Sequence, residues 1–520
     1  MKHLKKITME NQLLIFLSFW FFVNLFFLVK FPFAHTDEPW LSGLTRQMMS
    51  EKRLDVTEPF FDLYPRHPHA LKILFHLLQM PFILIGGYSL SSVRLLSLTV
   101  AVVCLYWFYK LLLRMGQEKD KNTALLITCL LSTDIQFIYA SHTARQEILL
   151  VLILILALYY YLGIHKTNQA FLSGLMIGLS FGIHPNAFIL SVPLGMLFLI
   201  DIMGKRKSFS MGLYYLLGLM GGGVFFALLS LFFNPEFIQD YLAYGTPLGV
   251  TRSPDTKFRQ LPLFLKQLFL RIGGTYYLPD IRVQMILFPL FLVLTGLMKK
   301  NRNIILSSTA GLLMGIAILG KYSPLSIVFL FPLLYLSMFT ILKDLHPLQI
   351  FLAGVLFLFL NIFVTVGNIR EEILPHEERE SYAEFLAAIQ EQIPSEGIIL
   401  ASLNTEYAFE VGHLFDFRNL SLLPVEKEKS LENYLKERQI EYILYPEELD
   451  FIYENRPVWN VLYGNPGKWY PQLQNFIKDH TVLMKTVNSP GYAMRIQAYK
   501  YTRMWTLKIY KILPEAASEE

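Results

Sequence analysis

Residues 11–40 read NQLLIFLSFWFFVNLFFLVKFPFAHTDEPW. The run from Asn11 to Phe33 is apolar and long enough to cross a bilayer as a helix, which takes roughly 20 residues. The basic start MKHLKK precedes it, and the exit at Phe31-Pro32-Phe33 has no small-residue cleavage site. We therefore expect an uncleaved signal anchor, with the acidic pair Asp37-Glu38 just beyond its outer end.

Further apolar runs follow along the first 370 residues. Those long enough to span a membrane cover residues 91–113, 122–141, 147–163, 168–183, 186–203, 210–233, 281–298, 303–320, 324–342 and 347–367. With the anchor they predict a bundle of about eleven transmembrane helices, and at most about thirteen. Residues 70–87 are also apolar but carry Lys72, His76 and Gln79, so we expect interfacial helices in the first outer loop.

Composition indicates a membrane protein with a second, soluble domain. The chain of 520 residues is 53% hydrophobic and only 17% charged, whereas average proteins carry about 25% charged residues. Residues 1–370 hold 31 Lys and Arg against 17 Asp and Glu, and residues 371–520 hold 15 against 24. We predict a membrane domain over 1–370 and an acidic, water-soluble domain over 371–520, and no nucleic-acid partner.

The pattern after residue 371 alternates between short apolar strands and amphipathic helices. The expected helices cover 381–392 and 431–438, and the expected strands cover 397–403, 441–445, 480–487 and 505–512. This alternation is typical of an α/β layer domain. The fold class is therefore mostly α, a polytopic helical bundle followed by an α/β domain.

The distribution of basic residues predicts the orientation, because Lys and Arg in short loops stay cytoplasmic. With the anchor running outward, the inner side receives Lys2, Lys5, Lys6, Lys110, Arg114, Lys119, Lys121, Lys166, Lys205, Arg206, Lys207, Lys299, Lys300, Arg302 and Lys343. The short outer turns receive only Arg145 and Lys321. We expect a multi-pass protein of a bacterial inner membrane, with a cytoplasmic N-terminus and an extracytoplasmic C-terminal domain.

Polar residues gather at the outer ends of the predicted helices. They are Asp37, Glu38, His67, His69, Lys72, Arg145, Glu147, Lys321 and Tyr322. A carboxylate at a helix exit can act as a general base, although it can also simply cap the helix. The side chains of Lys72, Arg145 and Lys321 could bind a phosphate group, or alternatively extend to the lipid headgroups.

The sequence predicts neither a metal nor a cofactor. His67 and His69 stand two residues apart, but no third ligand follows at a defined spacing. Cys104 and Cys129 both lie inside apolar runs, so a cysteine-based site is not available. No glycine-rich phosphate loop of the strand-to-helix type is present in the sequence.

Two motifs of the first outer loop resemble those of the polytopic GT-C glycosyltransferases, particularly the protein O-mannosyltransferase and aminoarabinose transferase branch, glycosyltransferase family 39. Asp37-Glu38 stand where an Asp-Glu pair opens the loop in the mannosyltransferases. The stretch His67-Pro68-His69-Ala70-Leu71-Lys72 keeps the His-Pro and Lys of a His-Pro-Pro-Leu-Gly-Lys motif. Arg145 with Glu147, and Lys321 with Tyr322, are similar to further family positions.

This resemblance implies an inverting transfer of a hexose or pentose from a polyprenyl-phosphate donor to an extracytoplasmic hydroxyl. The acceptor would be a lipid, a glycan or a protein, and membrane lipids would surround the enzyme. Asp37 would be the general base with Glu38 beside it, while Lys72 and Arg145 would steady the leaving phosphate. His67, His69, Glu147, Lys321 and Tyr322 would complete the substrate site.

A transporter or lipid flippase with an outer accessory domain is the alternative, since it would share the many spans and the basic loops. Transporters place ionisable residues near the middle of the membrane and are built from repeated halves. Here the polar residues concentrate at one outer face, and the sequence has no convincing internal repeat. The pattern therefore favours the transferase.

Overall fold

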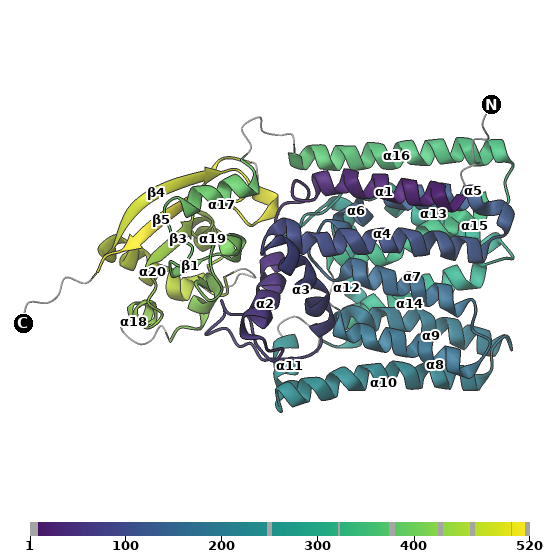
Figure 1. Ribbon diagram of the computed structural model, residues 1–520, viewed down its shortest axis with the longest axis horizontal. Helices are drawn as coiled ribbons and strands as arrows, with labels where there is room; N and C mark the ends of the chain where they lie inside the picture. Colours follow the sequence, from purple (N-terminus) through teal and green to yellow (C-terminus); the bar gives the residue numbers. More distant parts are fainter. Residues whose placement is uncertain are drawn as a thin grey trace, which may run out of the picture.

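In the computed structural model, the described residues are 9–246, 252–320, 323–373, 380–424, 430–457, 463–500 and 502–514. A bundle of long, roughly parallel helices forms one part, and a smaller α/β domain stands at one end of it (Figure 1). The chain therefore combines a mostly α fold with a small C-terminal sheet.

The bundle contains most helices of the first 373 residues, and the long ones run along its long axis (Figure 1). They are α1 (Met9–Phe27), α4 (Leu90–Met115), α5 (Lys121–Ser132), α6 (Ile135–Ser141), α7 (Glu147–Tyr161), α8 (Thr167–Leu179), α9 (Phe188–Met203), α10 (Phe209–Phe233), α13 (Arg282–Leu297), α14 (Arg302–Leu319), α15 (Phe331–Leu342) and α16 (Pro347–Ile373). Each of the eleven predicted runs coincides with one of these helices or with a broken pair.

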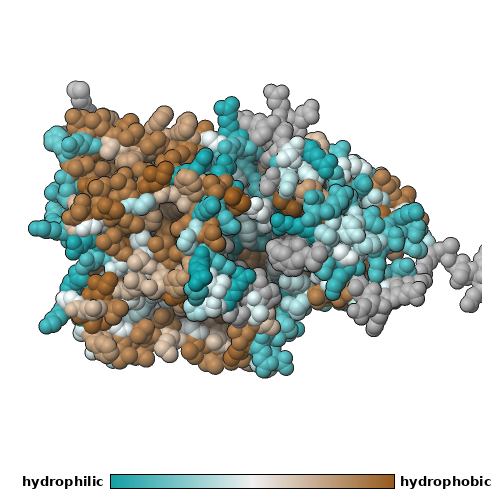
Figure 2. Space-filling view, turned by 180° about the vertical axis from the view of Figure 1, so that it is seen from behind, coloured by the Kyte–Doolittle hydropathy of each residue, from teal (hydrophilic) through white to brown (hydrophobic). Residues whose placement is uncertain are grey.

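The count of eleven spans is not confirmed. Within the described ranges, seven helices are long and apolar enough to cross a membrane, or eight if α5 and α6, bent by 66°, form one span. Three shorter apolar helices are α3 (Ile73–Gly86), α7 and α13. On the face that Figure 2 shows, apolar residues cover much of the bundle, whereas the α/β domain is largely hydrophilic. The protein is thus an integral membrane protein.

Several helices lie at the end of the bundle that faces the α/β domain. They are α2 (Asp37–Glu51), α3, α11 (Phe237–Gly245) and α12 (Pro254–Leu270). In Figure 1, α2 and α3 run steeply across the direction of the bundle helices. This placement agrees with the interfacial helices that the first outer loop predicts.

The C-terminal domain is built on a five-stranded sheet with the order β2-β1-β3-β5-β4. Its strands are β1 (Ile399–Ala401), β2 (Leu414–Asp416), β3 (Tyr442–Pro446), β4 (Thr481–Ser489) and β5 (Trp505–Ile512). The strands β2, β1 and β3 are parallel, and β5 is antiparallel to both neighbours. All four predicted strands are present, and β2 is an additional one.

Side chains alternate between the two faces of this sheet, as the strand period of two requires. Leu400 and Ile443 face a core formed with α18 (Ser430–Glu437), α19 (Glu448–Asn455) and α20 (Pro466–His480). On the other face, Ile399 and Ala401 belong to a core that contains α17 (Tyr382–Gln390) and the first outer loop through Phe60 and Phe61. The domain therefore shares a hydrophobic core with the loop that carries Asp37.

Polar contacts reinforce this docking. Asp416 N donates to the Phe60 carbonyl over 3.1 Å, and Asn419 Nδ2 donates to the same oxygen over 3.0 Å. Tyr434 and Arg438 both bind the carboxylate of Asp62. These contacts hold the α/β domain against the outer end of the bundle.

Candidate active site

Asp37 begins α2 directly after the exit of the anchor, and two distant segments meet its carboxylate. Arg145, in the turn between α6 and α7, forms an ion pair with Oδ2 of Asp37. Tyr276, in the segment between α12 and α13, donates its hydroxyl to the same oxygen and accepts from Arg145 over 3.0 Å. The Asp37 side chain is 23% exposed, so it remains accessible to a substrate.

Arg145 also joins Asp37 to Glu147. Its Nη2 lies 3.1 Å from Oε1 of Glu147, and its Nε lies 3.3 Å from Oε2. The guanidinium is therefore held between two carboxylates, and its contact with Glu147 is bidentate. The structure brings together three of the predicted site residues, Asp37, Arg145 and Glu147.

Asp37 is an ionised carboxylate in this environment. Burial raises its pKa, but the charge of Arg145, with His35 and the Tyr276 hydroxyl, lowers it further, to well below the usual range. His35 stacks on the Tyr276 ring with 4.3 Å between centroids, and burial lowers its pKa to about 4. The cluster thus contains an anionic Asp37, a cationic Arg145 and a neutral His35 near neutral pH.

Glu38 occupies a different environment from its neighbour. Its carboxylate is fully buried and accepts from Nε and Nη2 of Arg94, each over 2.7 Å. Ala144 N donates to the same carboxylate over 3.0 Å, and Arg94 also donates to the carbonyls of Leu28 and Pro32. These contacts connect the segment after α1 to α4 and enclose the carboxylate of Glu38.

A second cluster surrounds Lys72, the residue that precedes α3. A cavity of about 280 Å³ is lined by Pro65, Arg66, His67, His69, Lys72, His184, Pro185, Asn186, Phe237, Asp240, Tyr241, Tyr244 and Leu319. His67 Nδ1 lies 3.2 Å from Asp240, while His69 is enclosed and burial lowers its pKa to about 3. Three predicted residues, His67, His69 and Lys72, therefore share one cavity.

Trp40 connects the two clusters. It lies on α2, three residues after Asp37, and its Nε1 donates to Glu58 over 2.7 Å. Glu58 in turn binds Arg66 of the cavity wall over 2.5 Å. Lys321 and Tyr322, the remaining predicted residues, lie outside the described residues.

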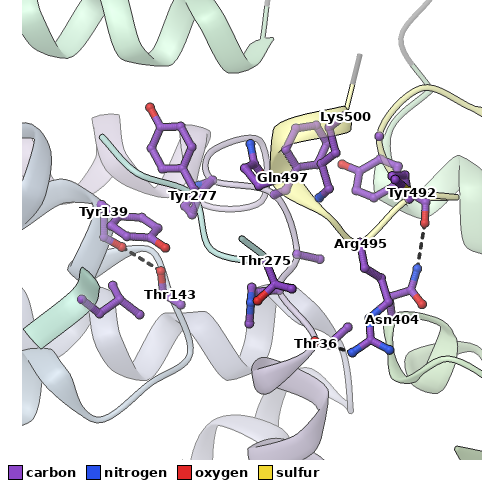
Figure 3. Close-up of a pocket in the computed structure, with 17 residues that line it drawn as sticks. Thr36, Tyr139, Thr143, Thr275, Tyr277, Asn404, Tyr492, Arg495, Gln497 and Lys500 are labelled. Carbon is purple, nitrogen blue, oxygen red and sulfur yellow. Dashed lines mark hydrogen bonds between the residues drawn. The ribbon is translucent and has the colours of Figure 1, made fainter. Parts of the chain in front are cut away.

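Two further cavities are lined by neighbours of Asp37 and by residues of the C-terminal domain. One of about 20 Å³ is lined by residues of the anchor exit, including Thr36, and by Asn404, Arg495 and Lys500 of the α/β domain (Figure 3). The other, of about 490 Å³, includes Tyr276, Arg271 and Arg282. Tyr277, Gln497 and Lys500 stand in the walls of both.

The sequence interpretation missed Tyr276, Arg94 and Arg495. Arg94 had a usable signal, because an arginine inside the apolar run 91–113 requires a partner. Tyr276 and Arg495 are separated from Asp37 and Thr36 by 239 and 459 residues, and no local pattern marks them. Within the described ranges, no three His, Cys, Asp or Glu side chains are grouped so that they could hold a metal ion.

The family model of dolichyl-phosphate-mannose-protein mannosyltransferases matches residues 67–230. This segment contains His67, His69 and Lys72 of the Lys72 cavity and the Arg145–Glu147 pair. Comparison with curated protein sequences gives no match.

Solved structures share the fold. ArnT from Cupriavidus metallidurans, bound to undecaprenyl phosphate, is similar with a TM-score of 0.57 and 12% identity, over 87% of this chain and 96% of that one. The archaeal oligosaccharyltransferase AglB from Archaeoglobus fulgidus, in complex with an inhibitory peptide and a dolichol-phosphate, has a TM-score of 0.51 and 14% identity, over 86% of this chain and 71% of that one. The chain is therefore similar to the dolichyl-phosphate-mannose-protein mannosyltransferases over residues 67–230, and it shares the polytopic fold of ArnT and AglB.

Proposed function

We propose that this protein is a glycosyltransferase that moves a sugar from a polyprenyl-phosphate donor to a hydroxyl group outside the cytoplasm, with inversion. The observation that carries the proposal is the contact of Asp37 with Arg145, a base and a phosphate-binding cation in one cluster. Undecaprenyl phosphate in ArnT and dolichol-phosphate in AglB support a lipid-phosphate donor. The proposed acceptor is a lipid, a glycan or a protein.

In the proposed reaction, Asp37 takes the proton of the acceptor hydroxyl. The acceptor oxygen forms a bond to the anomeric carbon as the bond from that carbon to the phosphate oxygen breaks. The lipid phosphate leaves with the electron pair, and Arg145 stabilises its charge. Because inversion needs a single displacement, the base and the leaving phosphate stand on opposite sides of the sugar.

Arg145 couples donor binding to the strength of the base. While it is paired with Asp37, it holds the carboxylate ionised but weakly basic. A donor phosphate offers the guanidinium a competing partner. If Arg145 turns toward that phosphate, the burial of Asp37 raises its basicity when the acceptor needs it.

We assign the donor phosphate to the cavity of about 280 Å³ that Lys72 lines. Arg66 and Lys72 supply positive charge, and His69 supplies a neutral, buried ring. Leu319 belongs to the same wall and precedes Lys321 by two residues, which is consistent with the predicted role of Lys321 and Tyr322 in donor binding. Glu38 positions Asp37 through Arg94.

The proposed orientation has the N-terminus in the cytoplasm of a bacterial cell and the active site outside it. The loop of Asp37, the Arg145 turn and the α/β domain all lie at one end of the bundle (Figure 1). We propose residues 1–370 as the catalytic membrane domain and residues 371–520 as a domain that completes the outer side of the site.

The test is release of polyprenyl phosphate by the purified full-length protein in lipid nanodiscs, given a panel of polyprenyl-phosphate sugars and a membrane extract as acceptor. We expect acceptor-dependent release and a product of inverted anomeric configuration by NMR. Lys72→Met should raise the KM for the donor, whereas Lys52→Met, on the exposed end of α2, should not. Retention of configuration would contradict the single displacement.

A further inference from the structure

Arg495 reaches from the C-terminal domain to the residue that precedes Asp37. It lies between β4 and β5, and its Nη2 donates to Thr36 Oγ1 over 3.0 Å (Figure 3). The residue is only 6% exposed. A cationic side chain of the second domain is therefore buried beside the proposed base.

The remaining nitrogens of Arg495 are not satisfied. In the part of the chain that the structure describes, Nε and Nη1 are buried without a hydrogen-bond partner, and so is Nε2 of His35 in the same cavity wall. The ring of Tyr463 lies 5.1 Å from Cζ, and Tyr463, Asp416 and Glu448 stabilise the cationic form of Arg495. Buried charged donors without partners are costly, so this arrangement suits an incoming acceptor atom.

The cavity at Arg495 has a positive lining. Arg495 and Lys500 belong to it, and among the described lining residues none is Asp or Glu. Its volume of about 20 Å³ holds little more than one water molecule. The neighbouring cavity of about 490 Å³ shares Lys500, Gln497 and Tyr277 with it, and its wall includes Tyr276, the hydroxyl partner of Asp37. Its charged lining residues are three cations, Arg271, Arg282 and Lys500, and two carboxylates, Glu371 and Glu372.

We propose that Arg495 and Lys500 form an oxyanion-binding subsite for the acceptor. The acceptor would occupy the larger cavity beside Tyr276 and direct a phosphate or carboxylate group toward Arg495. This proposal rests on the proposed function, and it adds that the acceptor is an acidic molecule. The donor phosphate is assigned elsewhere, because the Lys72 cavity and this one have no described lining residue in common.

Inorganic phosphate is the probe for this subsite. Its Kd is measured with the full-length protein in nanodiscs from the rise in Tm at constant ionic strength, for wild type, Lys500→Gln and Arg495→Lys. The matched control is Arg503→Gln, a charge loss in the same domain at an ion pair whose arginine side chain is 55% exposed. We expect at least about tenfold weaker binding in the first two variants and no change in the control.

The affinity for undecaprenyl phosphate distinguishes the two sources of the oxyanion. We expect this affinity to be the same in Lys500→Gln, Arg495→Lys and wild type. If Lys500→Gln and Arg495→Lys also bind undecaprenyl phosphate more weakly, the subsite binds the leaving group, which would overturn the assignment to the acceptor. An equal phosphate response in all four proteins would overturn the subsite itself. Neither measurement needs turnover, so failure of the subsite leaves the transferase proposal standing, and failure of turnover leaves the subsite standing.

Discussion

Asp37 and Glu38 are adjacent in sequence but have different surroundings. Asp37 is partly exposed and bound by Arg145 and Tyr276, whereas Glu38 is fully buried in an ion pair with Arg94. The sequence shows that both residues are acidic. Which of the two remains accessible depends on the position of Arg94, 56 residues later in the chain.

Arg145→Gln should change the pH dependence of the reaction. Burial is the largest influence on the pKa of Asp37, and Arg145 is the largest opposing one, so removing this charge raises that pKa. The deprotonated fraction then falls in mildly acidic solution. We expect the acid limb of the pH profile of kcat/KM to lie at higher pH in Arg145→Gln than in wild type and Arg145→Lys. Identical profiles for the three enzymes would contradict the pairing.

Glu38→Gln should destabilise the protein. It leaves the buried charge of Arg94 without its partner, which typically costs about 3–5 kcal/mol. Asp55→Asn is the control, because it breaks an exposed pair with Arg53 and should change the free energy of unfolding by less than about 1 kcal/mol. Thermal unfolding in nanodiscs measures both, and equal Tm values would argue against the positioning role of Glu38.

Helix α8 packs against α10 through glycines on both helices. A Cβ at Gly174 would stand 1.9 Å from the Tyr215 carbonyl oxygen, and one at Gly218 would stand 2.1 Å from that of Phe171. Such contacts allow helix backbones to approach closely inside a membrane, where small residues favour association. The pair lies within the segment that the mannosyltransferase family model matches.

Gly174→Ala should therefore separate α8 from α10 and lower the yield of folded protein. Gly221→Ala, on the same α10 helix, meets nothing within 4 Å and should be neutral or stabilising by about 0.5–1 kcal/mol. Size-exclusion profiles of the detergent-solubilised variants, with their Tm, report the difference. A normal profile for Gly174→Ala would show that the two helices can move apart without loss.

Most elements of the bundle were predictable because a membrane helix requires a long apolar run. The number of spans was not predictable, because α7 and α13 are short and the helix breaks between α5 and α6 near Asp134. In the C-terminal domain, the strands with clear apolar patterns are confirmed. Strand β2 has only three residues, Leu414 to Asp416, and such a length gives too weak a pattern.

At the scale of the whole molecule, Glu406 of the α/β domain contacts α2 of the membrane bundle. Arg46 of α2 lies 3.4 Å from Glu406 and donates to the Phe409 carbonyl over 2.7 Å, while Tyr88 donates to the other oxygen of Glu406. Both domains are therefore joined around one buried carboxyl group. No local sequence pattern predicts this contact, because its members are about 320 to 360 residues apart.

Glu406→Gln should make this contact less sensitive to pH. Burial raises the pKa of Glu406 from 4.5 to about 7, against the opposing effects of Arg46 and Tyr88. The folded protein then binds more protons than the unfolded chain between these values, so its stability falls as pH rises through this window, by about 3 kcal/mol at most. We expect Tm to decline from pH 5 to about pH 7.5 in wild type and less steeply in Glu406→Gln. Equal declines of Tm in the two proteins would show that a group other than Glu406 binds the proton.

Asp37 acts as the general base in the proposed sugar transfer. The most direct test of this role compares Asp37→Asn with wild type in the release of polyprenyl phosphate from a lipid-linked sugar, with Asp55→Asn as the control. We predict a rate about 10²- to 10⁴-fold lower for Asp37→Asn with an unchanged Tm, and a wild-type rate for the control. A rate for folded Asp37→Asn within about tenfold of wild type would contradict the claim.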